Sequence, residues 1–325
     1  MNLYGSICLL SPIVYPLISH AQQPTRQPAK PSQSPNIVHR EPSTVYRLPS
    51  TVNCKGQLLD LSSPIVMGIL NLTPDSFFDG GKYRDEQAIL SQAEKMLQDG
   101  ATLLDIGGAS SRPGAVLVSE SEELKRVIPV VELLLKHFPD ALLSVDTWRA
   151  SLAKEAVASG ASLINDISAG NFDAPLLETV AELQVPYVLM HMQGTPDTMQ
   201  QNPHYEDVVT EVLDFFIQKI SQLRAMGIKD IVLDPGFGFG KTVAHNFTLL
   251  KNLHIFQAVC GLPVLAGLSR KSMICKPLQI KPSDALNGTT ALHMIALQNS
   301  ASILRVHDVK EAMQVIALYE LVQMK

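Results

Sequence analysis

Polar and charged side chains follow short apolar runs at intervals along this 325-residue chain. At these positions stand Asn71, Asp105, Asp146, Asn165, Asp166, His191, Asp234, Lys271, Arg305 and His307. Short carboxylate and amide side chains offer paired donors and acceptors to a flat heterocycle with several ring nitrogens, and arginine forms two-pronged contacts with phosphate. The residue types therefore indicate a ligand that joins a heterocycle to phosphate groups.

The heterocycle would contact Asp146, Asn165 and Asp234, whose short side chains combine carboxylate and amide groups. Aspartate after a strand also commonly caps the helix that follows, and for Asp105 and Asp166 this alternative is equally good. Helix capping does not explain Asp146, Asn165, Asp234 and Lys271 together, because residues that only cap helices need not include a lysine.

The basic residues form a second group that suits an anion. Its members are Arg112, Arg270, Lys271, Arg305 and His307. The alternative for these residues is ion pairing with nearby acids such as Asp308 or Glu311. Asn71 could ligate Mg²⁺ through its side-chain oxygen, with phosphates and water completing the shell.

The stretch "LDPGFGFGKT" (233–242) resembles a phosphate-binding loop but does not match one. A P-loop needs a glycine where Pro235 stands, and the dinucleotide fingerprint needs a different glycine spacing. The glycines would allow a tight turn after Asp234. We interpret Lys241 as a solvated loop lysine that does not contact phosphate.

Composition excludes several classes of protein. The formal net charge is −5 and no long basic run suggests nucleic-acid binding. The four cysteines are widely spaced, as expected for reduced thiols in the cytoplasm. Zinc-ligand spacings and nucleophile motifs are absent from the sequence, and from residue 51 onward no apolar stretch is long enough to span a membrane.

Eight apolar runs alternate with amphipathic helical stretches. The runs are "IVMGIL" (65–70), "TLLDIG" (102–107), "LLSVD" (142–146), "SLIND" (162–166), "YVLMH" (187–191), "IVLD" (231–234), "PVLAG" (263–267) and "SILRV" (302–306). They lack polar alternation, which is typical of strands buried on both faces. Eight such units predict a single (β/α)8 TIM barrel, with a doubly wound open sheet as the alternative. In a barrel the polar strand ends would converge on one mouth.

The first 50 residues differ from the rest of the chain. They hold eight of the 21 prolines, and from residue 22 they are rich in Pro, Gln and Ser. We predict a disordered extension over 1–50 and one barrel domain over 51–325. The apolar segment near the N-terminus faintly resembles a signal peptide, but it lacks a preceding basic residue. A misassigned start codon is the other explanation of this extension.

Family-specific blocks occur in order between Leu58 and Glu320. They are "MGILNLTPDSFFDGG", "DIGGASSRPGA", "SVDT", "INDIS", "LMHMQGTPDTMQ", "LDPGFGFGK", "GLSRKSMI" and "RVHDV". With them the chain resembles the dihydropteroate synthase family, in a Bacteroides-like bacterial form. The resemblance implies an enzyme that joins 6-hydroxymethyl-7,8-dihydropterin diphosphate to 4-aminobenzoate, giving 7,8-dihydropteroate and diphosphate, in a cytoplasmic homodimer.

The resemblance also implies roles for individual residues. The pterin ring would contact Asp146, Asn165, Met190, Asp234 and Lys271. Diphosphate and Mg²⁺ would be held by Asn71, Ser111, Arg112, Arg305 and His307. Aminobenzoate would lie between Phe77, Pro113, Phe239 and Lys271, with its carboxylate near Ser272. Asp146, Lys271, Arg305 and His307 are the expected catalytic residues.

Two other functions are considered. A methyltransferase that moves methyl from methyltetrahydrofolate to a corrinoid protein uses the same scaffold but needs no diphosphate site. An inactive pterin-binding protein would be expected to lose Lys271, Arg305 or His307, and all three are present. Ala109 departs from the family, since many relatives have glutamate there, which puts details of that loop in doubt.

Overall fold

The computed structural model describes residues 51–72, 82–109 and 118–324. The chain divides into two units, Met1–Ser43 and Thr44–Lys325, and every described residue belongs to the second unit. The predicted extension over residues 1–50 lies outside the described residues, so its disorder and the boundary at residue 50 stay predictions.

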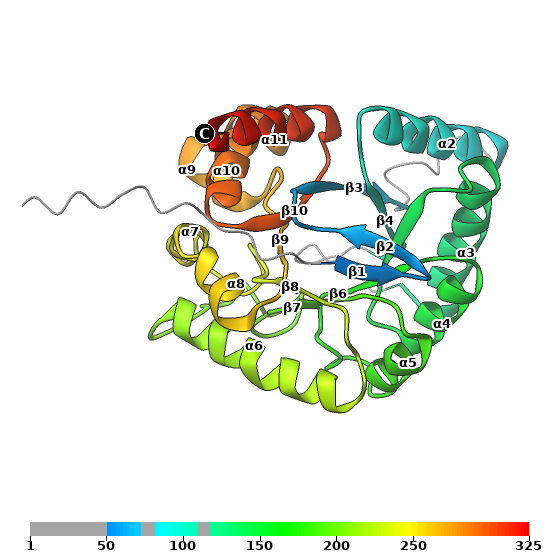
Figure 1. The fold of residues 1–325 in the computed structure, drawn as a ribbon, viewed down its shortest axis with the longest axis horizontal. Coiled ribbons are helices and arrows are strands. Elements are labelled where there is room, and N and C mark those ends of the chain that lie inside the picture. The colour runs from blue at the N-terminus through cyan, green and yellow to red at the C-terminus, as the bar shows by residue number, and fades with distance from the viewer. Residues whose placement is uncertain (1–50, 73–81, 110–117, 325) are drawn as a thin grey trace, which may run out of the picture. The chain divides into compact units, whose positions relative to one another are not determined.

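The predicted closed barrel is confirmed, and the open-sheet alternative is wrong. Its strands are β3 (Ile65–Asn71), β4 (Leu103–Gly107), β5 (Leu142–Asp146), β6 (Leu163–Asp166), β7 (Tyr187–Met190), β8 (Ile231–Asp234), β9 (Val264–Ala266) and β10 (Ala301–Val306). All neighbours pair in parallel, and β10 joins β9 to β3 to close the ring (Figure 1). Each strand lies on one of the eight apolar runs, because a strand buried on both faces needs an unbroken apolar segment.

Helices surround this ring of strands in Figure 1. They are α2 (Lys82–Gln98), α3 (Glu120–His137), α4 (Ala150–Ala158), α5 (Leu176–Leu183), α6 (Val208–Ala225), α7 (Val243–Lys251), α8 (His254–Cys260), α9 (Ser272–Leu278), the 3₁₀ turn η1 (Pro282–Asp284), α10 (Leu286–Gln298) and α11 (Val309–Gln323). Each longer helix buries one stripe, as Val212, Phe216 and Ile220 of α6 illustrate. The outer core therefore lies between helices and strands.

A short hairpin covers one end of the barrel. Strands β1 (Thr51–Cys54) and β2 (Gln57–Asp60) pair antiparallel. Lys55 and Gly56 between them both have positive φ, of 52° and 92°, as a two-residue turn of type I′ requires. The buried hairpin side chains form one cluster with inward-facing barrel residues such as Leu103 and Ile303. The amino-terminal end of the barrel is therefore filled by apolar packing.

Among the described residues no helix combines the length and the apolar character that crossing a membrane requires. This agrees with the sequence, which has no sufficiently long apolar stretch in the same part of the chain.

Candidate active site

The opposite end of the barrel carries the predicted polar residues. Parallel pairing places Gly107 beside both Asn71 and Asp146. Asp146 is in turn paired with Asn165 on β6. Because all eight strands point the same way, their carboxyl ends form one rim. The structure thus brings together residues that are far apart in the sequence.

Arg305 connects two acidic residues across this mouth. Its Nε donates to Asp105 Oδ2 at 2.6 Å, and its Nη2 donates to Asp146 Oδ2 at 2.8 Å. Burial raises the pKa of Asp146 to about 7, and the Arg305 guanidinium opposes that rise. The paired acids in turn raise the pKa of Arg305, so the guanidinium stays charged. The mouth therefore holds a half-buried cation between two carboxyl groups.

Asp105 has a larger part in the site than the sequence indicated. Its carboxylate is fully buried and also accepts hydrogen bonds from Ser144 Oγ at 2.5 Å and Asn165 Nδ2 at 2.9 Å. It caps none of the described helices, and α3, the next of them, has Ser119 as its N-cap, so the capping alternative is wrong for this residue. A carboxylate can only accept from the Asn165 amide, which fixes the orientation of that amide. The signal available in the sequence was an aspartate in the middle of an otherwise apolar run.

Asp166 does not cap the following helix α5, whose N-cap is Pro175, so the capping alternative is wrong for this residue as well. Its two oxygens accept from the backbone N–H groups of Ser168 and Gly170, both at 2.7 Å, and Tyr187 Oη donates to it as well. Its side chain therefore organises the loop after β6. It is not part of the mouth.

Asp234 and Lys271 form the other charged part of the mouth. Burial raises the pKa of Asp234, while the nearby Lys271 ammonium opposes the rise. A Cβ placed on Gly267 would lie 3.7 Å from Asp234 Oδ2 and 3.8 Å from Lys271 Nζ. The absent side chain therefore leaves space in front of both groups.

Lys271 is held by the loop that follows β8. Its Nζ donates to the carbonyl oxygen of Phe237 at 2.6 Å and lies 4.6 Å from the centre of the Phe239 ring. Burial lowers the pKa of Lys271 to about 8, and Asp234 opposes this change. The structure thus places Lys271 and Phe239 side by side, as aminobenzoate binding would require. Ser272 follows directly as the first residue of α9 and is exposed.

His307 lies next to Ser269 at the end of β10. Ser269 Oγ accepts from the His307 backbone N–H at 3.3 Å and is 3.1 Å from His307 Nδ1. A hydroxyl both donates and accepts, so either tautomer of the ring forms this contact with Ser269. The contact holds the His307 imidazole at the end of β10.

Two basic residues do not match their sequence interpretation. Arg270 of the anion-binding group forms a two-pronged ion pair with Asp308, at 2.8 and 2.5 Å, which is the ion-pair alternative. Lys241, interpreted as solvated, is buried with 3% of its surface exposed. Its Nζ contacts His191 Nδ1 at 2.9 Å, the His191 carbonyl at 3.2 Å and the Phe239 carbonyl at 3.0 Å. That interpretation of Lys241 is wrong because tertiary contacts cover the loop.

An apolar wall adjoins the charged groups. Met190 packs with Trp148 and Ile167, and the partly buried residues against this cluster include Ala109 and Phe239. Methionine and aromatic side chains provide flat, polarisable surfaces for a ring. Met190 therefore lies where a heterocycle held by Asp234 would meet an apolar surface, since the two residues are paired across β7 and β8.

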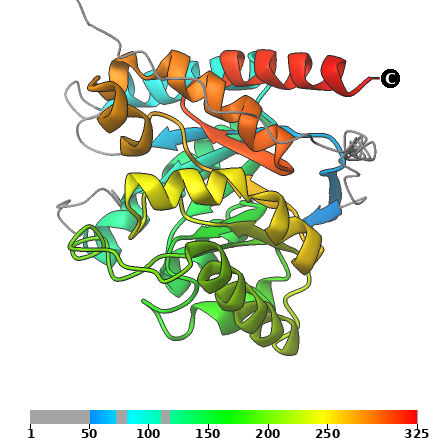
Figure 2. The same cartoon turned by 90° about the vertical axis from the view of Figure 1, so that its left-hand side faces the viewer.

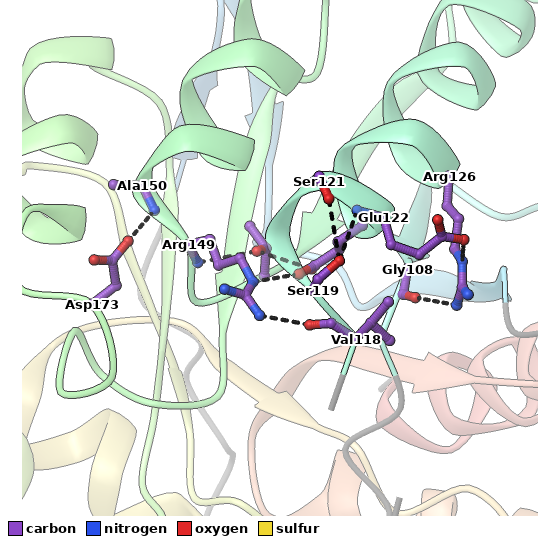
Figure 3. A network of polar contacts seen from close by, with 11 residues as sticks. Gly108, Val118, Ser119, Ser121, Glu122, Arg126, Arg149, Ala150 and Asp173 are labelled. Atoms are coloured by element: carbon purple, nitrogen blue, oxygen red, sulfur yellow. Dashed lines mark hydrogen bonds and ion pairs between the residues drawn. The ribbon is translucent and has the colours of Figure 1, made fainter. Parts of the chain in front are cut away.

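A polar network holds the chain next to the mouth, as Figure 3 shows. Arg149 donates to Glu123 at 2.8 Å and to the Val118 carbonyl at 2.8 Å, while Arg126 donates to the Gly108 carbonyl at 3.4 Å. These bonds anchor the described residues on both sides of 110–117. The predicted site residues Phe77, Ser111, Arg112 and Pro113 lie outside the described residues.

The donors available for a metal ion suit Mg²⁺. Asn71 Oδ1 and Asp146 Oδ2 would lie 3.6 and 3.9 Å from a Cβ on Gly107, so this glycine leaves open space between two hard oxygen donors. No group of three or more His, Cys, Asp or Glu side chains with metal-binding geometry occurs within the described ranges. Mg²⁺ tolerates this because it is commonly bound through one or two protein oxygens together with phosphates and water.

Comparison with known proteins agrees with this geometry. Residues 67–307 match the family described as pterin binding enzyme. The chain is 47% identical over 268 residues to dihydropteroate synthase of Escherichia coli K12, which covers 82% of this chain and 94% of that protein.

Solved structures give the same result. Yersinia pestis dihydropteroate synthase in a sulfonamide drug complex matches with a TM-score of 0.79 at 46% identity, covering 84% of this chain and 99% of that one. Dihydropteroate synthase from Xanthomonas albilineans in complex with 7,8-dihydropteroate matches with a TM-score of 0.76 at 41% identity, covering 85% and 100%. Barrel and mouth define a pterin-binding enzyme. The chain belongs to the dihydropteroate synthase family.

Proposed function

We propose that this protein joins 6-hydroxymethyl-7,8-dihydropterin diphosphate to 4-aminobenzoate, giving 7,8-dihydropteroate and diphosphate for folate biosynthesis. The observation that carries the proposal is the pair of charged sets at one mouth, Asp234 with Lys271 and Arg305 with its two acids. The first set suits a pterin and the second suits a diphosphate. Family membership and the relative solved with 7,8-dihydropteroate support the same reaction.

The pterin binds through Asp234, Asn165 and Lys271, with Asp146 and Met190 beside it. Asp234 as a carboxylate accepts from the amino group and ring N–H of the pterin, and Lys271 donates to a ring acceptor. The Asn165 amide is already oriented by Asp105, so it needs no rearrangement when the ligand arrives. Preorganisation of this kind raises affinity because less conformational freedom is lost on binding.

The diphosphate binds through Arg305 and His307, together with Ser111 and Arg112 from the segment outside the described residues. Arginine stabilises the charge that grows on diphosphate as the bond to it breaks, and His307 donates from a ring nitrogen. Mg²⁺, held by Asn71 together with phosphate oxygens and water, supplies further charge neutralisation when bound.

Aminobenzoate binds against Phe239 and the Lys271 stem, with its carboxylate near Ser272. Phe77 and Pro113 complete this site. The aniline nitrogen is a weak neutral nucleophile, so its placement beside the pterin methylene matters more than a strong base. Sulfonamides resemble aminobenzoate in shape and charge and are expected to compete for the same place.

The chemical step begins when the bond between the pterin methylene carbon and the diphosphate oxygen breaks. Both electrons leave with diphosphate, and the positive charge spreads over the dihydropterin ring. Asp146 stabilises this cation electrostatically as a carboxylate. The aniline lone pair then forms the C–N bond, and the nitrogen releases one proton to solvent.

The experiment that tests the function measures diphosphate release by the purified protein with dihydropterin diphosphate, Mg²⁺ and 4-aminobenzoate. We expect release that depends on aminobenzoate, is inhibited by sulfonamides and is lost in Lys271→Ala. A folded protein that binds pterin but releases no diphosphate would contradict the proposal and favour an inactive pterin-binding protein. Methyl transfer from methyltetrahydrofolate is the corresponding assay for the methyltransferase alternative.

We propose in addition that the protein is a homodimer. Helices α10 and α11 lie side by side, as Figure 2 shows, and their carboxyl-terminal halves expose Ile295 (39%), Leu318 (58%) and Leu321 (63%). Apolar side chains grouped on neighbouring helices are typical of a protein interface. Leu318→Glu is expected to shift sedimentation from dimer to monomer, whereas Leu58→Glu on the hairpin is expected to leave it unchanged.

A cytoplasmic location is the last part of this proposal. The described cysteines Cys54, Cys260 and Cys275 are all free thiols. Reduced thiols are the normal state of cysteine in the cytoplasm. Fractionation of cells that produce the full chain would test this location, and recovery outside the cytoplasm would contradict it.

A further inference from the structure

Lys241 is a buried lysine that the proposed reaction does not use. It stands at the end of the loop between β8 and α7, directly before the helix cap Thr242. Its Nζ is surrounded by three acceptors, namely Nδ1 and the carbonyl oxygen of His191 and the carbonyl oxygen of Phe239. An ammonium group has three hydrogens, whereas a neutral amine has two, so only the charged form can satisfy all three acceptors.

His191 is suited to accept from this ammonium. Burial lowers the pKa of His191 to about 2, and the Lys241 charge lowers it further in the same direction. The ring is therefore neutral, and an ammonium group 2.9 Å from Nδ1 can only donate to that nitrogen. The ring is held from its other side by edge contact with Phe215, at 4.9 Å between ring centres. Lys241 thus links its own loop to His191, directly after β7, and the His191 ring is itself packed against Phe215.

The contacts around Lys241 bind the loop after β8 to the segment after β7. A Cβ on Gly236 would overlap the His191 carbonyl oxygen, and a Cβ on Gly240 would overlap the Gln193 carbonyl oxygen. Both glycines have positive φ, of 68° and 63°. The two backbones therefore meet without intervening side chains, and any residue other than glycine would separate them.

Further hydrogen bonds from the segment after β7 reach the same loop. Tyr205 Oη donates to the Gly240 carbonyl at 2.9 Å, and Gln200 Nε2 donates to the Gly238 carbonyl at 2.6 Å. Between these anchored points the loop presents the Phe237 carbonyl and the Phe239 ring to Lys271. Of the anchors described here, the one from Lys241 is buried and is bonded to the Phe239 carbonyl itself.

We propose that Lys241 is a positioning residue that locks the β8–α7 loop onto His191 and thereby sets the place of Phe239 for the aminobenzoate half of the reaction. This inference rests on the proposed function. Asp234 belongs to the barrel strand, so the pterin half depends less on the lock. The two substrates should therefore respond differently when the lock is removed.

The test compares Lys241→Met with the unchanged protein. Methionine keeps length and apolar volume but removes all three donors. Since leaving buried acceptors unpaired is costly, we expect KM for 4-aminobenzoate to rise about tenfold or more, with pterin diphosphate affinity changed less than about threefold. Lys219→Met is the matched control, because Lys219 braces the loop after β6 through Ala169 and Asn171 but does not contact Lys271. Lys219→Met should leave both the KM for 4-aminobenzoate and the affinity for pterin diphosphate unchanged.

A second pair of variants keeps the test decisive if Lys241→Met does not fold. His191→Asn retains an oxygen acceptor close to the position of Nδ1, whereas His191→Leu has none, and both lose the ring. Under the proposal, His191→Asn binds aminobenzoate better than His191→Leu.

The outcomes separate the alternatives. Equal effects on both substrates, or a fall in the active fraction with both KM values unchanged, would show a purely structural lysine and overturn the inference. Absence of turnover in the unchanged protein would instead contradict the proposed function. If the unchanged protein shows no turnover, the position of the β8–α7 loop is followed instead by the NMR chemical shift of the Lys271 side chain, which contacts that loop. A shift unchanged by Lys241→Met would overturn the inference there too.

Discussion

The two ends of the barrel bury opposite kinds of side chain on the same strands. On β4, Leu103 and Asp105 are two residues apart and both fully buried, yet one belongs to an apolar layer and the other to the ionic network. On β10, Ile303 and Arg305 repeat this change. Residues two apart on a strand point to the same face. The side chains inside the barrel therefore change from apolar to charged over about 7 Å along the strand.

The difference teaches how this barrel tolerates a charged interior. The apolar layer and the hairpin above it remove surface from water, which stabilises the fold. The charged end gains little net stability, because taking ions out of water offsets their attraction. Its residues are instead oriented for a ligand. We expect substitutions at the apolar end to affect stability alone, and those that break an ion pair at the mouth to affect both stability and activity.

The largest effect is expected from Arg305→Met, which removes the cation between Asp105 and Asp146. Breaking a buried pair leaves uncompensated charge and costs roughly 3 to 5 kcal/mol of unfolding free energy. Activity should fall by about a thousandfold or more, since the diphosphate also loses its arginine.

The stability loss in Arg305→Met should depend on pH. Without the cation, nothing opposes the rise that burial causes in the pKa of Asp146, so the penalty is full at high pH and shrinks as pH falls and Asp146 becomes protonated. Urea unfolding near pH 8 and near pH 5 measures this. A loss of equal size at both pH values would contradict the ionic explanation.

The matching change at the apolar end is Leu103→Ala. Emptying a fully buried leucine site should cost about 2 to 5 kcal/mol of unfolding free energy. KM for both substrates should stay the same in the folded fraction, because the cavity lies below the ionic layer. A changed KM, measured at a temperature where the variant is fully folded, would show that the two ends are coupled.

A smaller effect is expected from Asp105→Asn on the same strand. The neutral amide weakens the bonds to Arg305 and Asn165 and allows the Asn165 amide to turn over. Loss of one charged hydrogen bond costs about 1.5 to 3 kcal/mol, so pterin affinity should fall roughly tenfold to a hundredfold. Isothermal titration with the pterin substrate measures this. Unchanged pterin affinity would show that Asp105 serves the fold alone.

The smallest effect concerns pH. The pKa of Asp146 is raised to about 7, and that of Lys271 is lowered to about 8. If the reaction uses the carboxylate and the ammonium, kcat/KM should rise with pH through about 7 and fall above about 8. In Asp146→Asn, the rise of kcat/KM through about pH 7 should disappear. Any pH dependence that comes from ionisation of a substrate should remain. A profile of Asp146→Asn identical to that of the unchanged protein would contradict the assignment.

The sequence by itself determined the eight strands of the barrel. Burial on both faces requires an unbroken apolar run, and eight such runs were visible without any structure. It also indicated several residues of the mouth, since parallel strands all end on one side. Asp146, Asn165, Asp234 and Arg305 could therefore be named from chain order alone.

Only the tertiary structure decided which of these groups meet. Arg305 contacts Asp105 across 200 residues of sequence, and Lys241 is covered by His191 from another loop, 50 residues away. Arg270 could be an anion ligand or an ion-pair partner until Asp308 was seen beside it. Spacing along a chain encodes the period of a strand or helix, whereas burial and ion pairing depend on which distant segment packs against each side chain.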